Sequence, residues 1–169
     1  MGLREIKKQL NKMDKNALVN HISEMYKKYK PVKEYIEFNL NPIEPDILSK
    51  YKKNIRECFY PIRGMQFKFS LAKQLLKDYK KLNPSITSLA DLLLYFVECG
   101  IEFTNDFGDI DEDFYTSLEN VYDSALNLCP KIKDIESLKK RALKIVDESS
   151  NIGWGFNDGI IDIYYSYFE

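Results

Sequence analysis

Hydrophobic residues recur every three or four positions along most of this chain, which is the spacing that gathers them on one face of a helix. Proline, glycine and asparagine interrupt the pattern at short intervals, so each stretch reads as one helix. The pattern predicts helices over residues 3–10, 14–29, 31–40, 46–59, 70–82, 88–107, 109–128, 135–148 and 154–168. Residues 60–69 lack a helical period and are predicted to form a packed loop.

No segment shows the strong alternation of a half-buried strand, so we expect an all-α fold. The helices should form an irregular multi-helix array of eight or nine helices, either solenoid-like or a bundle. No fixed repeat and no linker divides the chain, and residues 1–169 are therefore predicted to be a single helical domain.

The helix predicted at 88–107 is apolar over roughly 220° of its circumference, counting about 100° per residue. A helix this apolar must be surrounded by other elements. Either Ser85 or Ser88 can cap its start, and Gly108 should close it. Its remaining arc is one polar stripe, formed by Asp91, Tyr95, Glu98, Glu102 and Asn105.

The last predicted helix, 154–168, carries too many aromatic and aliphatic residues for one face, so it too should be largely enclosed. Asp158 and Asp162 lie one turn apart on it. Its start brings Asn157 and Trp154, an indole that either lines a site or anchors the helix in the core.

The acidic stripes of these two predicted helices suggest that the helices share one site. An unpaired buried carboxylate is very costly, so the two acidic stripes should either face a groove or be paired with Lys and Arg. We expect them to line one concave ligand-binding pocket with Trp154 at its rim. The predicted pocket residues are Tyr95, Glu98, Glu102, Asn105, Trp154, Asn157, Asp158 and Asp162.

The same carboxylates suggest an alternative with a metal. Glu98, Glu102, Asp158 and Asp162 could bind a divalent cation, because hard cations prefer clustered oxygen ligands. Such a protein would be a metal-dependent hydrolase. The only histidine, His21, does not have the spacing from these acids that di-iron bundles use. We therefore expect no cofactor, and catalytic residues cannot be named from the sequence.

Charge divides the chain into a basic and an acidic half. Residues 1–81 contain 19 Lys and Arg against 9 Asp and Glu, whereas residues 82–169 contain 6 against 17. Complementary charged surfaces favour a protein partner or self-association. The basic half could also bind nucleic acid, but the chain has no known reading module, so we expect such binding to be weak at most.

The three cysteines are far apart and form no CxxC pair, which argues against a disulfide framework or a zinc site. No apolar run approaches the ~20 residues of a membrane span. The sequence therefore predicts a cytoplasmic protein without a membrane segment.

Two segments carry a resemblance. YFVECGIEFTNDFGDIDEDFY, residues 95–115, and GWGFNDGIIDIYY, residues 153–165, together with the LREIKK opening, resemble an uncharacterised family of bacterial domains of unknown function. The resemblance covers nearly the whole chain and implies an all-helical bacterial protein. It implies no activity, cofactor or catalytic residue. Without a catalytic constellation, we expect a cytoplasmic helical binding or scaffold module.

Overall fold

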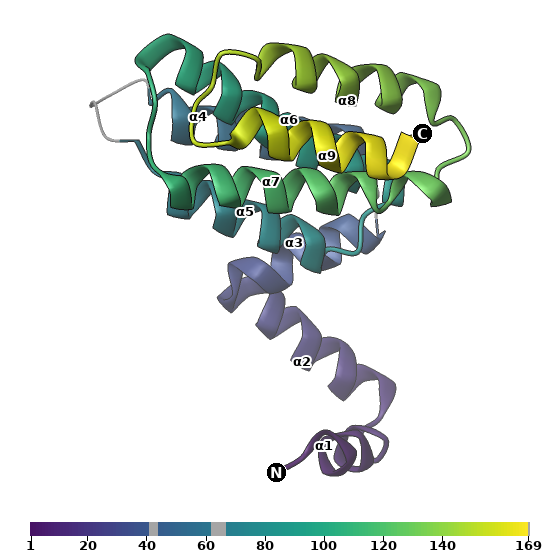
Figure 1. Cartoon of the computed structure of the whole chain (residues 1–169). Coiled ribbons are helices and arrows are strands. Elements are labelled where there is room, and N and C mark those ends of the chain that lie inside the picture. The colour runs from purple at the N-terminus through teal and green to yellow at the C-terminus, as the bar shows by residue number, and fades with distance from the viewer. Residues whose placement is uncertain (41–43, 62–66, 169) are drawn as a thin grey trace. The chain divides into compact units, whose positions relative to one another are not determined.

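The computed structural model describes residues 1–40, 44–61 and 67–168, and this part of the chain is helical and contains no strand. Its helices confirm the predicted all-α fold (Figure 1). Their bounds are α1 Leu3–Leu10, α2 Lys15–Lys28, α3 Lys30–Leu40, α4 Glu44–Phe59, α5 Phe69–Lys81, α6 Ile86–Phe107, α7 Glu112–Leu126, the 3-10 turn η1 Cys129–Lys131, α8 Glu136–Glu148 and α9 Phe156–Phe168.

The helices separate into two compact units, Met1–Ile43 and Glu44–Glu169. That the whole chain acts as one domain stays a prediction.

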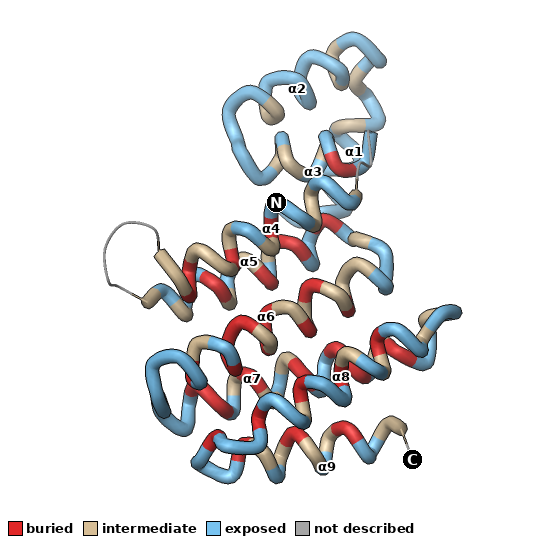
Figure 2. The backbone as a smooth tube through the Cα atoms, turned by 90° about the horizontal axis from the view of Figure 1, so that it is seen from above, coloured by how far each residue is buried: buried red, intermediate tan, exposed pale blue. Residues whose placement is uncertain are grey.

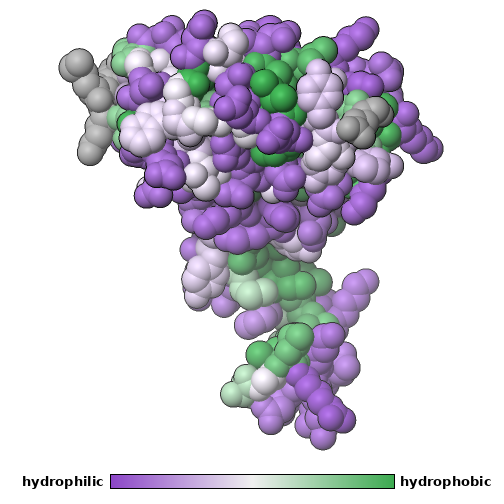
Figure 3. Space-filling view, viewed as in Figure 1, coloured by the Kyte–Doolittle hydropathy of each residue, from purple (hydrophilic) through white to green (hydrophobic). Residues whose placement is uncertain are grey.

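In the first unit, α2 packs against α3. Asp14 caps α2, since its carboxylate accepts a hydrogen bond from the Ala17 backbone N–H at 2.8 Å. The hydrophobic residues of α2 and its C-cap are only partly buried: Ile22 is 45% exposed, and Tyr29, at the end of the helix, is 57% exposed. Hydrophobic side chains accordingly lie exposed on the N-terminal helices (Figure 3).

The second unit is a stack of three antiparallel helix pairs, α4/α5, α6/α7 and α8/α9 (Figure 1). Alternate helices contact each other across the stack: α6 contacts α4 and α8, and α9 contacts α7. One layer therefore consists of α4, α6 and α8, and the other of α5, α7 and α9. The solenoid-like form of the prediction describes this arrangement better than a bundle does.

The middle pair contributes the largest share of the core of any pair (Figure 2). Nine residues of α6 are buried, because neighbouring helices cover it on both sides and α7 covers it from the other layer. Ser85, rather than Ser88, caps its start, and its hydroxyl accepts from the Ser88 N–H at 3.2 Å. Gly108 closes the helix at a φ of 91°, a conformation that favours glycine.

Two predicted features of the later helices are wrong. The helix after α6 starts later than expected, because Asp111 and not Asp109 is its N-cap. The last helix is not largely enclosed, since only Phe156, Ile160 and Tyr164 are buried on it. It ends the stack and so has a neighbouring pair on one side only.

The predicted loop at 60–69 and the proline break before α4 fall partly on residues 62–66 and 41–43, which lie outside the described residues. Over the described helices, none combines the length and the apolar character that a membrane span requires.

Candidate functional site

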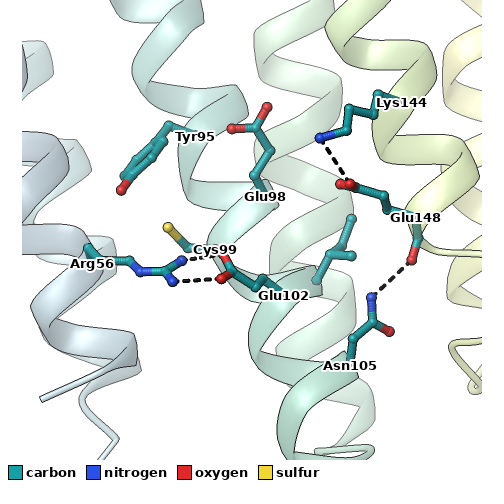
Figure 4. A pocket seen from close by; sticks show the side chains of 9 residues that line it. Arg56, Tyr95, Glu98, Cys99, Glu102, Asn105, Lys144 and Glu148 are labelled. Carbon is teal, nitrogen blue, oxygen red and sulfur yellow. Dashed lines mark hydrogen bonds and ion pairs between the residues drawn. The ribbon is translucent and has the colours of Figure 1, made fainter.

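The polar face of α6 forms the floor of a groove between α4 and α8. The groove holds a hollow of about 400 Å³ (Figure 4). Residues of α4, α6 and α8 line it together: Arg56, Tyr95, Glu98, Cys99, Ile101, Glu102, Asn105, Lys144 and Glu148. We call this hollow the polar groove.

Arg56 of α4 fixes one wall to the floor. Its guanidinium donates to both oxygens of Glu102, with Nη2 to Oε1 at 2.6 Å. This pair lowers the pKa of the Glu102 carboxyl and raises the pKa of Arg56, so both stay charged. The same guanidinium lies 4.0 Å from the centre of the Tyr60 ring, a cation–π contact.

Arg141 of α8 fixes the other wall. It donates to Glu98, with Nη2 to Oε2 at 2.7 Å, and also to Asp91, which accepts from Lys52 of α4 at 2.8 Å. Burial opposes ionisation of Asp91, but Lys52 and Arg141 outweigh it and lower the pKa of that carboxyl. A chain of ion pairs therefore ties α4, α6 and α8 together.

Arg141 also lines a second hollow of about 610 Å³. This hollow lies over the start of α8, and its lining residues are Thr87, Asp91, Lys131, Ile132, Lys133, Asp134, Ser137, Leu138 and Arg141.

Tyr95 and Cys99 contribute neutral side chains to the floor. Burial raises the pKa of Tyr95 to about 12 and that of the Cys99 thiol to about 11, although Arg56 and Tyr95 act to lower the thiol value. Cys99 is therefore protonated at neutral pH and is a poor nucleophile. The Lys52 ammonium lies 5.3 Å from the centre of the Tyr95 ring.

The far end of the groove is closed by contacts to the last turn of α8. Lys144 pairs with Glu148 at 3.0 Å, and the Asn105 amide donates to the Glu148 carbonyl at 3.2 Å (Figure 4). The groove thus presents fixed positive and negative groups and several hydrogen-bonding groups, an arrangement suited to holding a polar ligand.

Tyr95, Glu98, Glu102 and Asn105 lie together as predicted, but the other four predicted pocket residues do not line this groove. Asp158 and Asp162 are exposed on α9. The expected pocket shared by the two acidic stripes is therefore wrong in its geometry. The reason is the alternation of layers, which places α4 and α8 beside α6 and puts α9 against α7.

Trp154 and Asn157 have other surroundings. Trp154 is 59% exposed at a φ of 60°, so it neither lines the groove nor anchors α9 in the core. Ile152 and Phe156 are buried on either side of it instead. The Asn157 amide donates to the Ser149 hydroxyl at 2.9 Å and so joins the end of α8 to α9.

The four carboxylates of the metal alternative do not come together in the structure. Glu98 and Glu102 are held by arginines of two different helices, and Asp158 and Asp162 lie on α9. Among the described residues, no three His, Cys, Asp or Glu side chains are grouped closely enough to hold an ion.

Sequence reasoning missed the residues of the groove walls. Lys52 and Arg56 are four residues apart, and Arg141, Lys144 and Glu148 follow steps of three and four, so each set lies on one helix face. The basic residues of these two faces, opposite in sign to the acidic stripe of α6, were the signal that could have identified its neighbours.

A family model described as "Family of unknown function (DUF6155)" matches residues 1–169. The chain belongs to this family. The resemblance to a helical family of unknown function is thereby confirmed, while a bacterial origin of DUF6155 stays a prediction. No match to this chain was found among curated proteins or among solved structures.

Proposed function

We propose that this protein is a helical binding module that holds a polar ligand, or a polar segment of a partner protein, in the polar groove. One observation carries the proposal. The longest and most buried helix, α6, turns its only polar face into a hollow between α4 and α8.

The stacked helix pairs support this function. Stacks of helix pairs present extended surfaces on one layer, and proteins of this kind use those surfaces for binding. The ion pairs of Arg56 and Arg141 hold the charges of the groove in place before a ligand arrives, which lowers the ordering cost of binding.

The cellular setting is part of the proposal. All three cysteines are free and buried, as suits a reducing cytoplasm.

The groove is acidic in composition, with three glutamates against one arginine and one lysine, so a ligand that carries positive as well as negative groups fits it best.

A photo-crosslinking amino acid placed at Lys144 tests the proposal in the cells from which the protein comes. Lys144 lines the groove, but its side chain is 69% exposed, so the substitution should not disturb the fold. We expect a discrete crosslinked product from this position. The matched control is the same substitution at Lys77, an exposed residue of α5 in the other layer.

The second control fills the groove. Asn105→Trp places an indole over the floor while leaving the ion pairs of Arg56 and Arg141 intact, and it should abolish the product from position 144. Equal products from positions 144 and 77, or a product that persists in the Asn105→Trp background, would rule out the polar groove as the binding site.

A further inference from the structure

We propose a second binding site, separate from the polar groove, for a partner protein segment with one aromatic or aliphatic side chain flanked by Lys or Arg. The site is an apolar hollow of about 410 Å³ between the ends of α4 and α6. Its lining residues, which we call the aromatic groove, are Phe59, Tyr60, Pro61, Phe67, Phe103, Phe107 and Ile110.

The wall of the aromatic groove is built from packed rings. The Phe103 ring stacks on Phe67 with centroids 4.6 Å apart and meets Phe107 at 4.8 Å, and Tyr60 meets Phe107 at 6.0 Å. These rings hold one another in position, so a side chain entering the hollow meets a preformed apolar surface.

Phe107 leaves the groove incompletely covered. Its side chain is 67% exposed, although it belongs to the most buried helix of the chain. A single exposed hydrophobic residue is ordinary, but one that borders an apolar hollow marks a place where a partner side chain can bury substantial area.

The segment around Phe107, residues 106–113, gives the surrounding surface its charge. It holds five carboxylates, Asp106, Asp109, Asp111, Glu112 and Asp113, and no Lys or Arg. In the part of the chain that the structure describes, none of the five forms an ion pair.

The partners of these carboxylates are neutral. Asp106 accepts from the Tyr60 hydroxyl at 2.7 Å, and Asp109 accepts from the Tyr115 hydroxyl at 3.1 Å. By contrast, Asp91, Glu98 and Glu102 are each paired with Lys or Arg. Arg56, which stacks on the Tyr60 ring, is already held by Glu102.

Charge complementarity therefore selects the occupant. A negative rim that pairs with no Lys or Arg among the described residues attracts a cationic segment to the apolar hollow and repels an acidic one. Asp109 also lies against Gly153, where an added Cβ would stand 2.9 Å from its Oδ2. The next residue, Trp154, supplies another exposed aromatic side chain on which a Lys or Arg can stack.

Selection from a displayed library of random 12-residue peptides against the full chain tests this site. We expect enriched sequences to carry one aromatic or large aliphatic residue with Lys or Arg on both sides. A synthetic copy of the most enriched peptide should bind in fluorescence anisotropy, and its affinity should fall at least tenfold for Phe107→Ser. Asp106→Asn together with Asp109→Asn should weaken binding and reduce its dependence on salt.

The matched control is Leu143→Ser, which replaces an exposed hydrophobic residue of α8 that does not line the groove. Its affinity should equal that of the parent protein. No enrichment, enrichment of acidic peptides, or equal losses for Phe107→Ser and Leu143→Ser would overturn the proposal. So would self-association in light scattering that Phe107→Ser abolishes, because the occupant would then be a second copy of the chain.

Discussion

Glu119 of α7 is a partly buried carboxylate that lies over Gly159 of α9. A Cβ at Gly159 would stand 2.6 Å from the Glu119 Oε1, so the glycine provides the space that this carboxylate fills. Glu119 has no hydrogen bond or ion pair with another described residue that would compensate its burial, and burial raises the pKa of its carboxyl.

A raised carboxyl pKa favours folding at acid pH and opposes it once the pH exceeds the folded-state pKa. We therefore expect Glu119→Gln to raise the thermal midpoint at pH 7 and to lose this advantage near pH 4. Thermal melts followed by circular dichroism at the two pH values measure the difference. An equal effect at both values would show that ionisation of Glu119 is not its cause.

Replacing Arg141 should change stability in the opposite direction to Glu119→Gln. Arg141→Met leaves Asp91 and Glu98, which are both about one-quarter exposed, without their shared cation. We expect a loss of about 2–3 kcal/mol at pH 7, somewhat below the cost of breaking a fully buried pair. Since the Asp91 pKa is lowered in the folded state, the loss should shrink as the pH falls below about 4. Urea unfolding at pH 7 and pH 3.5 compares the two.

At the scale of single elements, Gly100 of α6 lies against the Leu118 side chain of α7. A Cβ built there would lie 2.7 Å from both methyl carbons of Leu118. Gly100→Ala should therefore destabilise the fold by about 1–3 kcal/mol, despite the better helix propensity of alanine. Leu118→Ala clears the space beside Gly100. In that background, Gly100→Ala should raise the free energy of unfolding instead of lowering it. A double-mutant cycle from urea unfolding checks this, and additive losses would contradict it.

The elements themselves follow largely from the sequence. The helix at 88–107 and its polar stripe were predictable because a period of 3.6 residues separates one apolar arc from one polar arc. The neighbours of that stripe were not, because periodicity says which face is buried but not what covers it. The helices predicted at 88–107 and 154–168 both carry paired acids, so they were expected to share one pocket. In the structure, α9 lies in the other layer and packs against α7.

Local chemistry also set limits to prediction. Ser85 and Ser88 both have a suitable side chain for capping α6, and only the path of the incoming chain decides between them. Trp154 was expected at a pocket rim or in the core, but the turn that starts α9 points it outward at positive φ. Turns with positive φ at a residue other than glycine are hard to foresee from the sequence.

At the scale of the whole molecule, the ion pairs between helices bear on metal binding. Glu98 and Glu102 of the polar groove are already neutralised by arginine, so a divalent cation would have to displace a guanidinium to bind them. We expect 5 mM Mg²⁺ or Mn²⁺, on the order of a saturating concentration for a functional site, to leave the thermal midpoint of the full chain unchanged, because only a ligand bound to the folded state raises it. A rise that Glu102→Gln removes would restore the metal-dependent hydrolase as a candidate.

The positions of the three cysteines allow local opening of the helix stack to be measured by thiol labelling. Cys58 lies in α4, Cys99 in α6 and Cys129 just after α7, and all three thiols are buried and free. A thiol reagent can reach them only when the surrounding helices open, so labelling rates under native conditions measure local opening free energies. In a stack that opens from its ends, Cys58 of the outer pair should react before Cys99 of the middle pair. Three single-cysteine variants would thus show whether this molecule unfolds one helix pair at a time or all at once.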